Sequence, residues 1–143
     1  MARHTMTGPG NRRAVAVCAV VASLAPPALA ADKDPIDGAL ERCLETPSGQ
    51  TTAGMVECIG AATTAWDRRL NEAYQKAMQA LDPRSQDLLR ASQRKWLAFR
   101  DAEATALNGP WRLSAGTLAQ VTTANANLSA VKERAEELSA YTD

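Results

Sequence analysis

Apolar residues recur every three or four positions over three long stretches of this chain, which is the spacing of one face of an α-helix. The stretches run from about residue 53 to 81, from 85 to 107 and from 117 to 140. They are separated at Asp82-Pro83 and at Asn108-Gly109-Pro110, where proline and glycine end helices and turn the chain. Since no run alternates β-branched or aromatic residues with polar ones as a strand does, we expect an all-α protein, a small antiparallel bundle of three long helices.

Residues 1–30 have the pattern of a cleaved secretory signal peptide. Arginines without any acid precede an apolar run from Ala14 to Leu24, and Ala28-Leu29-Ala30 resembles a cleavage site. The run is shorter than the ~20 apolar residues that span a bilayer, which disfavours a retained transmembrane anchor. We therefore expect one exported domain, residues 31–143, that is periplasmic or secreted. Arg12-Arg13 leaves both Sec and twin-arginine export open.

The charge and residue types that remain after this segment exclude several classes of function. Three of the 16 basic residues and none of the 16 acidic ones lie in it, so 13 basic and 16 acidic residues remain. This acidic balance disfavours nucleic-acid binding and modestly favours a basic partner. The only histidine, His4, is lost too, which excludes a Ser-His-Asp group and a histidine zinc site. Acids such as Glu57, Asp101 and Glu103 form no recognisable glycosidase pair, so we expect no catalysis, no metal and no cofactor.

A short helix is predicted before the three long ones, from Pro35 to a point before Pro47. It carries Cys43, and Cys58 lies 15 positions later in the first long helix. An even pair of cysteines in an exported domain indicates a disulfide, which for a loop of this length would contribute roughly 3 kcal/mol of stability. The alternative, a redox-active pair, lacks the C-x-x-C spacing.

A seam of aromatic and amide side chains is predicted between the first two long helices. Its members on the later helix share one face and are Gln93, Trp96 and Phe99; those on the earlier helix are Leu70, Asn71 and Tyr74. At this helical spacing Trp96 and Phe99 are assigned to the core. Arg100 and Asp101 are adjacent, so they point about 100° apart and are not expected to pair with each other. Charges near the seam are interpreted as interhelical salt bridges, with a charged groove as the alternative.

Two loops are the best candidates for binding a partner. Residues 45–52 form a polar loop, with Ser48 and Gln50 as candidate contacts, and the predicted disulfide would lower the entropy cost of docking it. The second loop follows Asn108 and offers Trp111 and Arg112, residue types enriched in interface hot spots. Trp111 could equally fold back and cap the bundle.

Several short motifs occur in a characteristic order: Cys43, Met55-Val56-Glu57-Cys58, Leu70-Asn71, Tyr74, Gln93-Arg94-Lys95-Trp96, Phe99-Arg100-Asp101 and Arg134-Ala135. From about Cys43 to Leu138 the chain thereby resembles the LprI-type lysozyme-inhibitor domain family. The resemblance implies a small, exported, cysteine-bridged helical domain of bacterial envelopes, whose named activity is inhibition of lysozyme. The motif residues that it marks are Leu70, Asn71, Tyr74, Gln93, Trp96, Arg100, Asp101 and Arg134.

The chain departs from this family in its cysteines. Members commonly carry a further cysteine three residues after the Arg-Asp pair and another later in the chain. Here the first position is Ala104, and no cysteine follows it. Loss of both together fits two cysteines that pair with each other, which leaves Cys43 to pair with Cys58.

We interpret the chain as an exported binding protein rather than an enzyme, one that inhibits lysozyme or a related peptidoglycan hydrolase by occluding the cleft. The alternative is a structural or assembly factor of the cell envelope that binds another protein without inhibiting an enzyme. The expected partner is a protein in both cases. The target, the contacting loop and the oligomeric state are left open.

Overall fold

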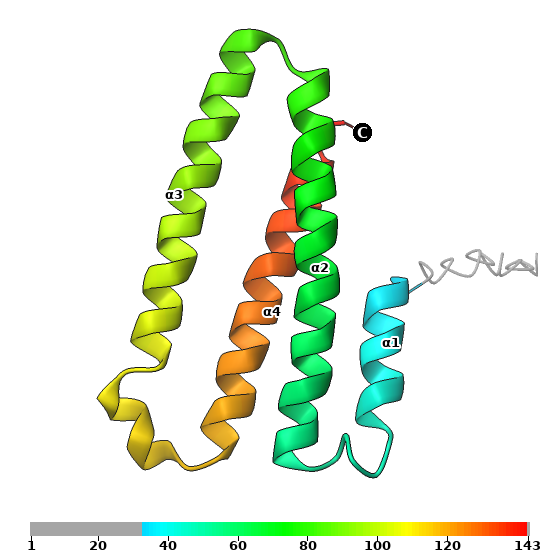
Figure 1. Cartoon of the computed structure of the whole chain (residues 1–143), viewed down its shortest axis with the longest axis vertical. Helices are drawn as coiled ribbons and strands as arrows, with labels where there is room; N and C mark the ends of the chain where they lie inside the picture. Colours follow the sequence, from blue (N-terminus) through cyan, green and yellow to red (C-terminus); the bar gives the residue numbers. More distant parts are fainter. Residues whose placement is uncertain (1–32, 143) are drawn as a thin grey trace, which may run out of the picture. The chain divides into compact units, whose positions relative to one another are not determined.

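The structure, a computed structural model, describes residues 33–142, and the predicted signal peptide lies outside them. This part of the chain forms four α-helices and one 3-10 helix and has no strand: α1 (Pro35–Leu44), α2 (Thr52–Ala80), α3 (Pro83–Leu107), η1 (Pro110–Ala115) and α4 (Leu118–Ser139) (Figure 1). The predicted all-α class is confirmed, and the α-helices end within about two residues of the predicted positions. The 3-10 helix η1 lies where a loop was expected. Between residues 33 and 142, no helix is long and apolar enough to cross a membrane.

Three of the α-helices begin next to a side chain that satisfies their first free backbone N–H groups. Asp34, Thr51 and Asp82 accept hydrogen bonds from backbone N–H groups of the first turns at 2.8–3.2 Å. Pro35 and Pro83 follow two of these residues, at a position where the missing proline donor costs nothing. The short links reverse the chain each time, so consecutive α-helices alternate in direction (Figure 1).

The core lies mainly between α2 and α4, which run in roughly the same direction (Figure 1). Each helix buries one apolar stripe, and the buried residues are Ile59, Ala62, Trp66, Leu70, Ala73 and Ala77 of α2 and Leu128, Val131, Ala135 and Leu138 of α4. The apolar spacing of three and four residues predicted for both stretches is thus confirmed as a buried face. The largest interface joins two helices that run the same way, and alanines on both stripes let α4 approach α2 closely.

The third long helix, α3, is less buried than its apolar pattern predicts. Only Leu89 and Gln93 of α3 are buried, while Leu88 is 66% and Phe99 is 60% exposed. The assignment of Phe99 to the core was therefore wrong, and Trp96 is only half-buried. Glu103, a charged residue, lies four positions after Phe99 on the same side of the helix, which indicates that this end of α3 leaves the core.

The short helix α1 is held against α2 and α4 by charges that surround Trp66. The Trp66 indole N–H donates to Asp37 at 3.2 Å, and the Lys132 ammonium pairs with the same carboxylate at 2.6 Å. Asp34 pairs with Arg69, and the Arg69 and Lys132 charges lie 4.7 and 5.2 Å from the centre of the Trp66 ring. This arrangement joins three helices that are distant in sequence.

These ion pairs predict how the stability depends on pH. Burial raises the pKa of Asp34, but the Ile36 N–H and the Arg69 guanidinium outweigh it, so the pKa is lowered from 3.8. The hydrogen bond to Asp37 outweighs burial at Lys132, so the pKa of Lys132 is raised from 10.5. The Asp34 contribution is therefore present above pH 3.8 and lost as the pH falls through its lowered pKa, while the Lys132 contribution is present below pH 10.5 and lost as the pH rises through its raised pKa.

We expect the free energy of unfolding, measured by urea titration, to be highest between the lowered pKa of Asp34 and the raised pKa of Lys132 and to fall at more acidic and at more basic pH. An Asp34→Asn variant should lose less stability than the parent protein when both are taken from pH 6 to pH 3, because it no longer has this carboxylate to protonate. Equal losses in the two proteins would contradict the role assigned to Asp34.

Candidate functional site

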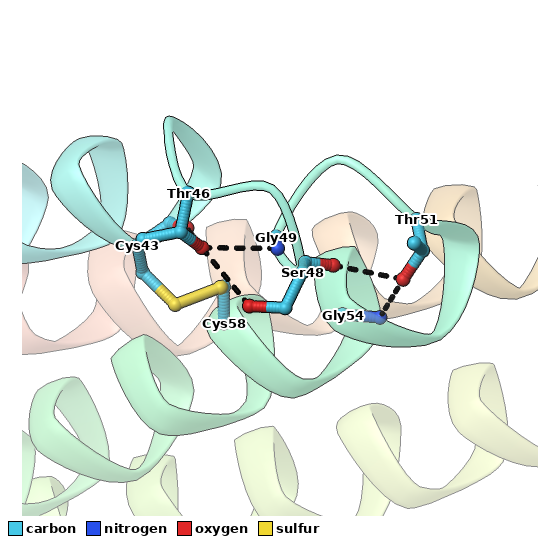
Figure 2. The surroundings of a disulfide bond; sticks show 7 residues. All are labelled: Cys43, Thr46, Ser48, Gly49, Thr51, Gly54 and Cys58. Atoms are coloured by element: carbon cyan, nitrogen blue, oxygen red, sulfur yellow. Dashed lines mark hydrogen bonds between the residues drawn. A yellow bond between two sulfur atoms is a disulfide. The ribbon is translucent and has the colours of Figure 1, made fainter.

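A disulfide joins Cys43 at the end of α1 to Cys58 in α2, as predicted. Two threonines order the loop that it closes (Figure 2). The Thr46 hydroxyl donates to the Cys43 carbonyl at 2.7 Å and accepts from the Gly49 N–H at 3.0 Å. The Thr51 hydroxyl donates to the Ser48 carbonyl at 2.8 Å and, at the start of α2, accepts from an N–H at 3.0 Å. The loop therefore has one defined conformation before any partner binds.

Two glycines let this loop lie directly on its neighbours. A Cβ at Gly54 would sit 1.9 Å from the Ser48 carbonyl oxygen, and one at Gly49 would sit 2.0 Å from the Cys43 carbonyl oxygen. Any larger residue would push the loop away from the helix. The side chains of Ser48 and Gln50, predicted as contacts, are exposed on this rigid loop, and a preordered loop loses little entropy on binding.

The η1 turn presents one predicted contact and uses the other for its own structure. Trp111 donates from its indole N–H to the Ala106 carbonyl at 2.9 Å and so caps α3, yet 63% of the residue is exposed. The structure thus shows the cap, while the role of Trp111 as a partner contact stays a prediction. Arg112 donates to the carbonyls of Leu107 and Ala119 at 3.0 and 3.2 Å and lies 5.0 Å from the Trp111 ring centre, so it joins α3 to α4.

Both loops lie at the same end of the helical unit (Figure 1). An apolar hollow of about 560 Å³ lies at this end too, lined by Phe99 and Leu107 of α3, Ala124 of α4 and Val56 of α2. We call the loop of residues 45–51, η1 and this hollow the loop end. The sequence analysis missed Phe99 as a surface residue and Val56 as part of this hollow. Glu103, one helical turn after Phe99, was the signal that could have revealed the exposure of Phe99.

The family-motif residues lie elsewhere, on α2 and α3 around the space between these two helices, with Arg134 on α4. Leu70, Gln93 and Arg134 are buried, Tyr74, Trp96 and Arg100 are half-buried, and Asn71 and Asp101 are exposed. A groove of about 340 Å³ is lined by Asn71, Tyr74, Gln93, Arg94, Trp96 and Arg100, and we call it the motif groove. The seam predicted between these two helices is therefore partly open to solvent.

Arg134 connects α4 to this groove. Its guanidinium donates to the Gln93 side-chain oxygen at 3.0 Å and to the Ser92 hydroxyl at 3.3 Å, and it pairs with Glu137 at 2.9 Å. It also lies 5.9 Å from the ring centre of Trp96. Only 8% of Arg134 is exposed, and a buried cation is tolerated because these groups satisfy it. The network fixes the positions of Gln93 and Trp96.

Arg100 joins α3 to α2 at the edge of the motif groove. It lies 3.8 Å from Asp67 of α2, as the salt-bridge interpretation predicts, and 5.3 Å from the Trp96 ring centre. It also pairs with Asp101 at 3.1 Å. The expectation that these two adjacent residues do not pair was wrong, because the long arginine side chain folds back to its neighbour on the helix surface.

The acidic side chains of the described residues are not gathered as a reaction centre would need. Glu57, Asp101 and Glu103 are exposed, and no three His, Cys, Asp or Glu residues between 33 and 142 lie together as metal ligands would. This part of the chain offers two surfaces suited to binding: the loop end, with its ordered loop and exposed aromatic side chains, and the motif groove.

Comparison with known proteins identifies the family. The fold is similar to the crystal structure of an uncharacterized protein from Burkholderia thailandensis, with a TM-score of 0.71 and 31% identity; the match covers 76% of this chain and 53% of that one, so this chain spans about half of that protein's length. No curated protein is significantly similar to the chain in sequence. Residues 43–138, most of the chain, match the family model described as "Lysozyme inhibitor LprI". The chain therefore belongs to the LprI family of lysozyme inhibitors.

Proposed function

We propose that this protein is an exported, non-catalytic inhibitor of lysozyme or of a related peptidoglycan hydrolase, and that its loop end occludes the enzyme's cleft. The family match over residues 43–138 carries the proposal. The signal-like pattern of residues 1–30 supports removal of that segment and a periplasmic or secreted location for residues 31–143.

The shape and rigidity of the loop end support the proposed mode of binding. A substrate cleft is concave, so its inhibitor needs a projecting surface that keeps its shape. The disulfide and the two threonines hold the loop of residues 45–51 in place (Figure 2), and Trp111 and Phe99 add exposed aromatic area of the kind that dominates binding energies. The mildly acidic balance of residues 31–143 would favour approach to a basic enzyme.

A lysis assay tests this proposal. A peptidoglycan suspension is treated with a c-type lysozyme, with and without the disulfide-bonded protein, at low and at physiological salt. We expect protection that rises with dose and persists at physiological salt, because cleft occlusion does not depend on long-range charge alone. Absence of protection at a large molar excess would reject inhibition of c-type lysozyme and would favour an envelope factor that binds another protein.

The contribution of the loop end can be tested with a matched pair of substitutions. Gln50→Lys places a positive charge on the loop, where a basic enzyme would repel it, and we expect the concentration for half-maximal inhibition to rise at least about tenfold. Gln79→Lys makes the same change on an exposed position about 40 Å away along α2, and it should leave inhibition unchanged. Equal effects of both substitutions would place the contact surface elsewhere.

A further inference from the structure

The motif groove is concave and has more arginines than acids in its lining, although the chain around it is mildly acidic. Arg90, Arg94 and Arg100 line it, against the single acid Asp67. Arg100 pairs with Asp67 and Asp101, and Arg90 pairs with Asp87. Arg94 is exposed and forms no ion pair within residues 33–142. One guanidinium fork is thus available for an anion, and such a fork matches the two oxygens of a carboxylate.

The rest of the groove is suited to a sugar ring. Tyr74 and Trp96 supply aromatic rings, whose negative faces attract the polarised C–H groups of a pyranose. Asn71, Gln75 and Gln93 supply amides that can exchange hydrogen bonds with hydroxyl or acetamido groups. A cavity of about 340 Å³ lies at the small end of the range for ligand pockets, which suits one or two sugar rings.

Parts of this groove are held in position before a ligand arrives. The buried Arg134 fixes the Gln93 side-chain oxygen and lies near the Trp96 ring, and Arg100 lies near the same ring. The buried Arg134 guanidinium needs no ligand to stabilise its charge, because Glu137 pairs with it and Ser92 accepts a hydrogen bond from it. Side chains fixed in this way lose little further entropy on binding.

The groove borders the hollow of the loop end at Arg100, which lines both, but it is distant from the loop of residues 45–51. From Thr52, where α2 leaves the loop, to Asn71 in the groove, the helix rises about 28 Å. A ligand of one or two sugar rings in the groove is much shorter than this distance and would therefore leave the loop of residues 45–51 free.

We propose that the motif groove binds a carboxylate-bearing N-acetylated amino sugar, with Arg94 on the carboxylate and Tyr74 and Trp96 against the ring. A free carboxylate would use the arginine alone and leave the rings and amides without a role. A neutral sugar would leave the Arg94 charge without a role. This binding site goes beyond inhibition, since it would attach the protein to an acidic glycan while the loop end contacts the enzyme.

The experiment is titration of the disulfide-bonded protein, without lysozyme, by calorimetry and by two-dimensional NMR. Three probes are compared: a disaccharide of N-acetylglucosamine and N-acetylmuramic acid, the neutral disaccharide chitobiose, and lactate. We expect the acidic disaccharide to bind with a Kd of about 1 mM or tighter, with shifts at Tyr74 and Trp96, and the other two probes to bind at least about tenfold more weakly.

A matched pair of arginine and lysine substitutions tests the assigned contact. Arg94→Gln should weaken binding of the acidic disaccharide by about tenfold or more. Lys95→Gln removes the same charge from the next residue, which lies outside the groove lining, and should change binding by less than about twofold. No binding of the acidic disaccharide, equal binding of chitobiose or lactate, or equal effects of the two substitutions would each overturn the proposal. None of these outcomes bears on lysozyme inhibition, because no enzyme is present.

Discussion

Replacing Trp66 with alanine is expected to lower the free energy of unfolding by about 3–5 kcal/mol. Trp66 is only 2% exposed and is one of the largest fully buried side chains among the described residues. Its removal would leave a cavity in the α2 stripe and would also take away the ring that Arg69 and Lys132 approach. Because Asp37 of α1 accepts the Trp66 N–H, we expect the first turns of α1, which the disulfide does not hold, to loosen first. Urea unfolding followed by circular dichroism measures the loss of stability, and hydrogen exchange of the α1 amides measures the loosening.

Trp111→Ala is the control for this substitution, because it removes the same side chain from the surface. Trp111 is largely exposed, and its indole hydrogen bond caps the end of α3. The free energy of unfolding should fall by no more than about 1 kcal/mol. If the two alanine variants were equally stable, Trp66 would not be at the centre of the core.

Replacing Cys43 and Cys58 together with alanine is expected to cost about 3 kcal/mol of stability, as the chain-entropy relation gives for a loop of this length. We expect the double variant to inhibit lysozyme less well even where it remains folded, so the loss of inhibition should exceed what unfolding alone would cause. Without the bridge, the loop of residues 45–51 depends on the Thr46 and Thr51 hydrogen bonds and the close contacts of Gly49 and Gly54. A loop with more conformations binds a cleft less tightly.

The measurement is the lysis assay at a temperature where circular dichroism shows that the double variant is folded. Reduction of the parent protein by dithiothreitol should reproduce the loss, since it breaks the same bond without changing a residue. Full inhibition by a folded double variant would show that the ordered loop does not make the contact.

The helices themselves could be read from the sequence with good accuracy. Periodic apolar residues, the prolines at 35, 83 and 110, and the polar residues that precede α1, α2 and α3 are local signals, and their physical causes act within a few residues. The disulfide was also predictable, since only two cysteines follow the signal-like segment. These features depend on composition and spacing, which the sequence displays directly.

The position of α3 could not be read in the same way. Phe99 and Leu88 follow a helical apolar pattern, yet they are exposed because α4 packs on α2 and leaves much of α3 uncovered. Periodicity shows that a helix has an apolar face, but it does not show which neighbour covers that face. Because α4 packs on α2 rather than covering α3, the motif groove is open and Phe99 is exposed.

The sequence by itself determined the helical class, the ends of the helices, the disulfide and the family, because each of these depends on local spacing or on motifs in order. Only the tertiary structure decided which surfaces are available for binding. It placed the two loops at one end of the helical unit, buried Arg134 against Gln93 and left Arg94 exposed in a groove. These outcomes depend on how closely helices distant in the chain can pack, and that is set by the fit of their side chains in three dimensions.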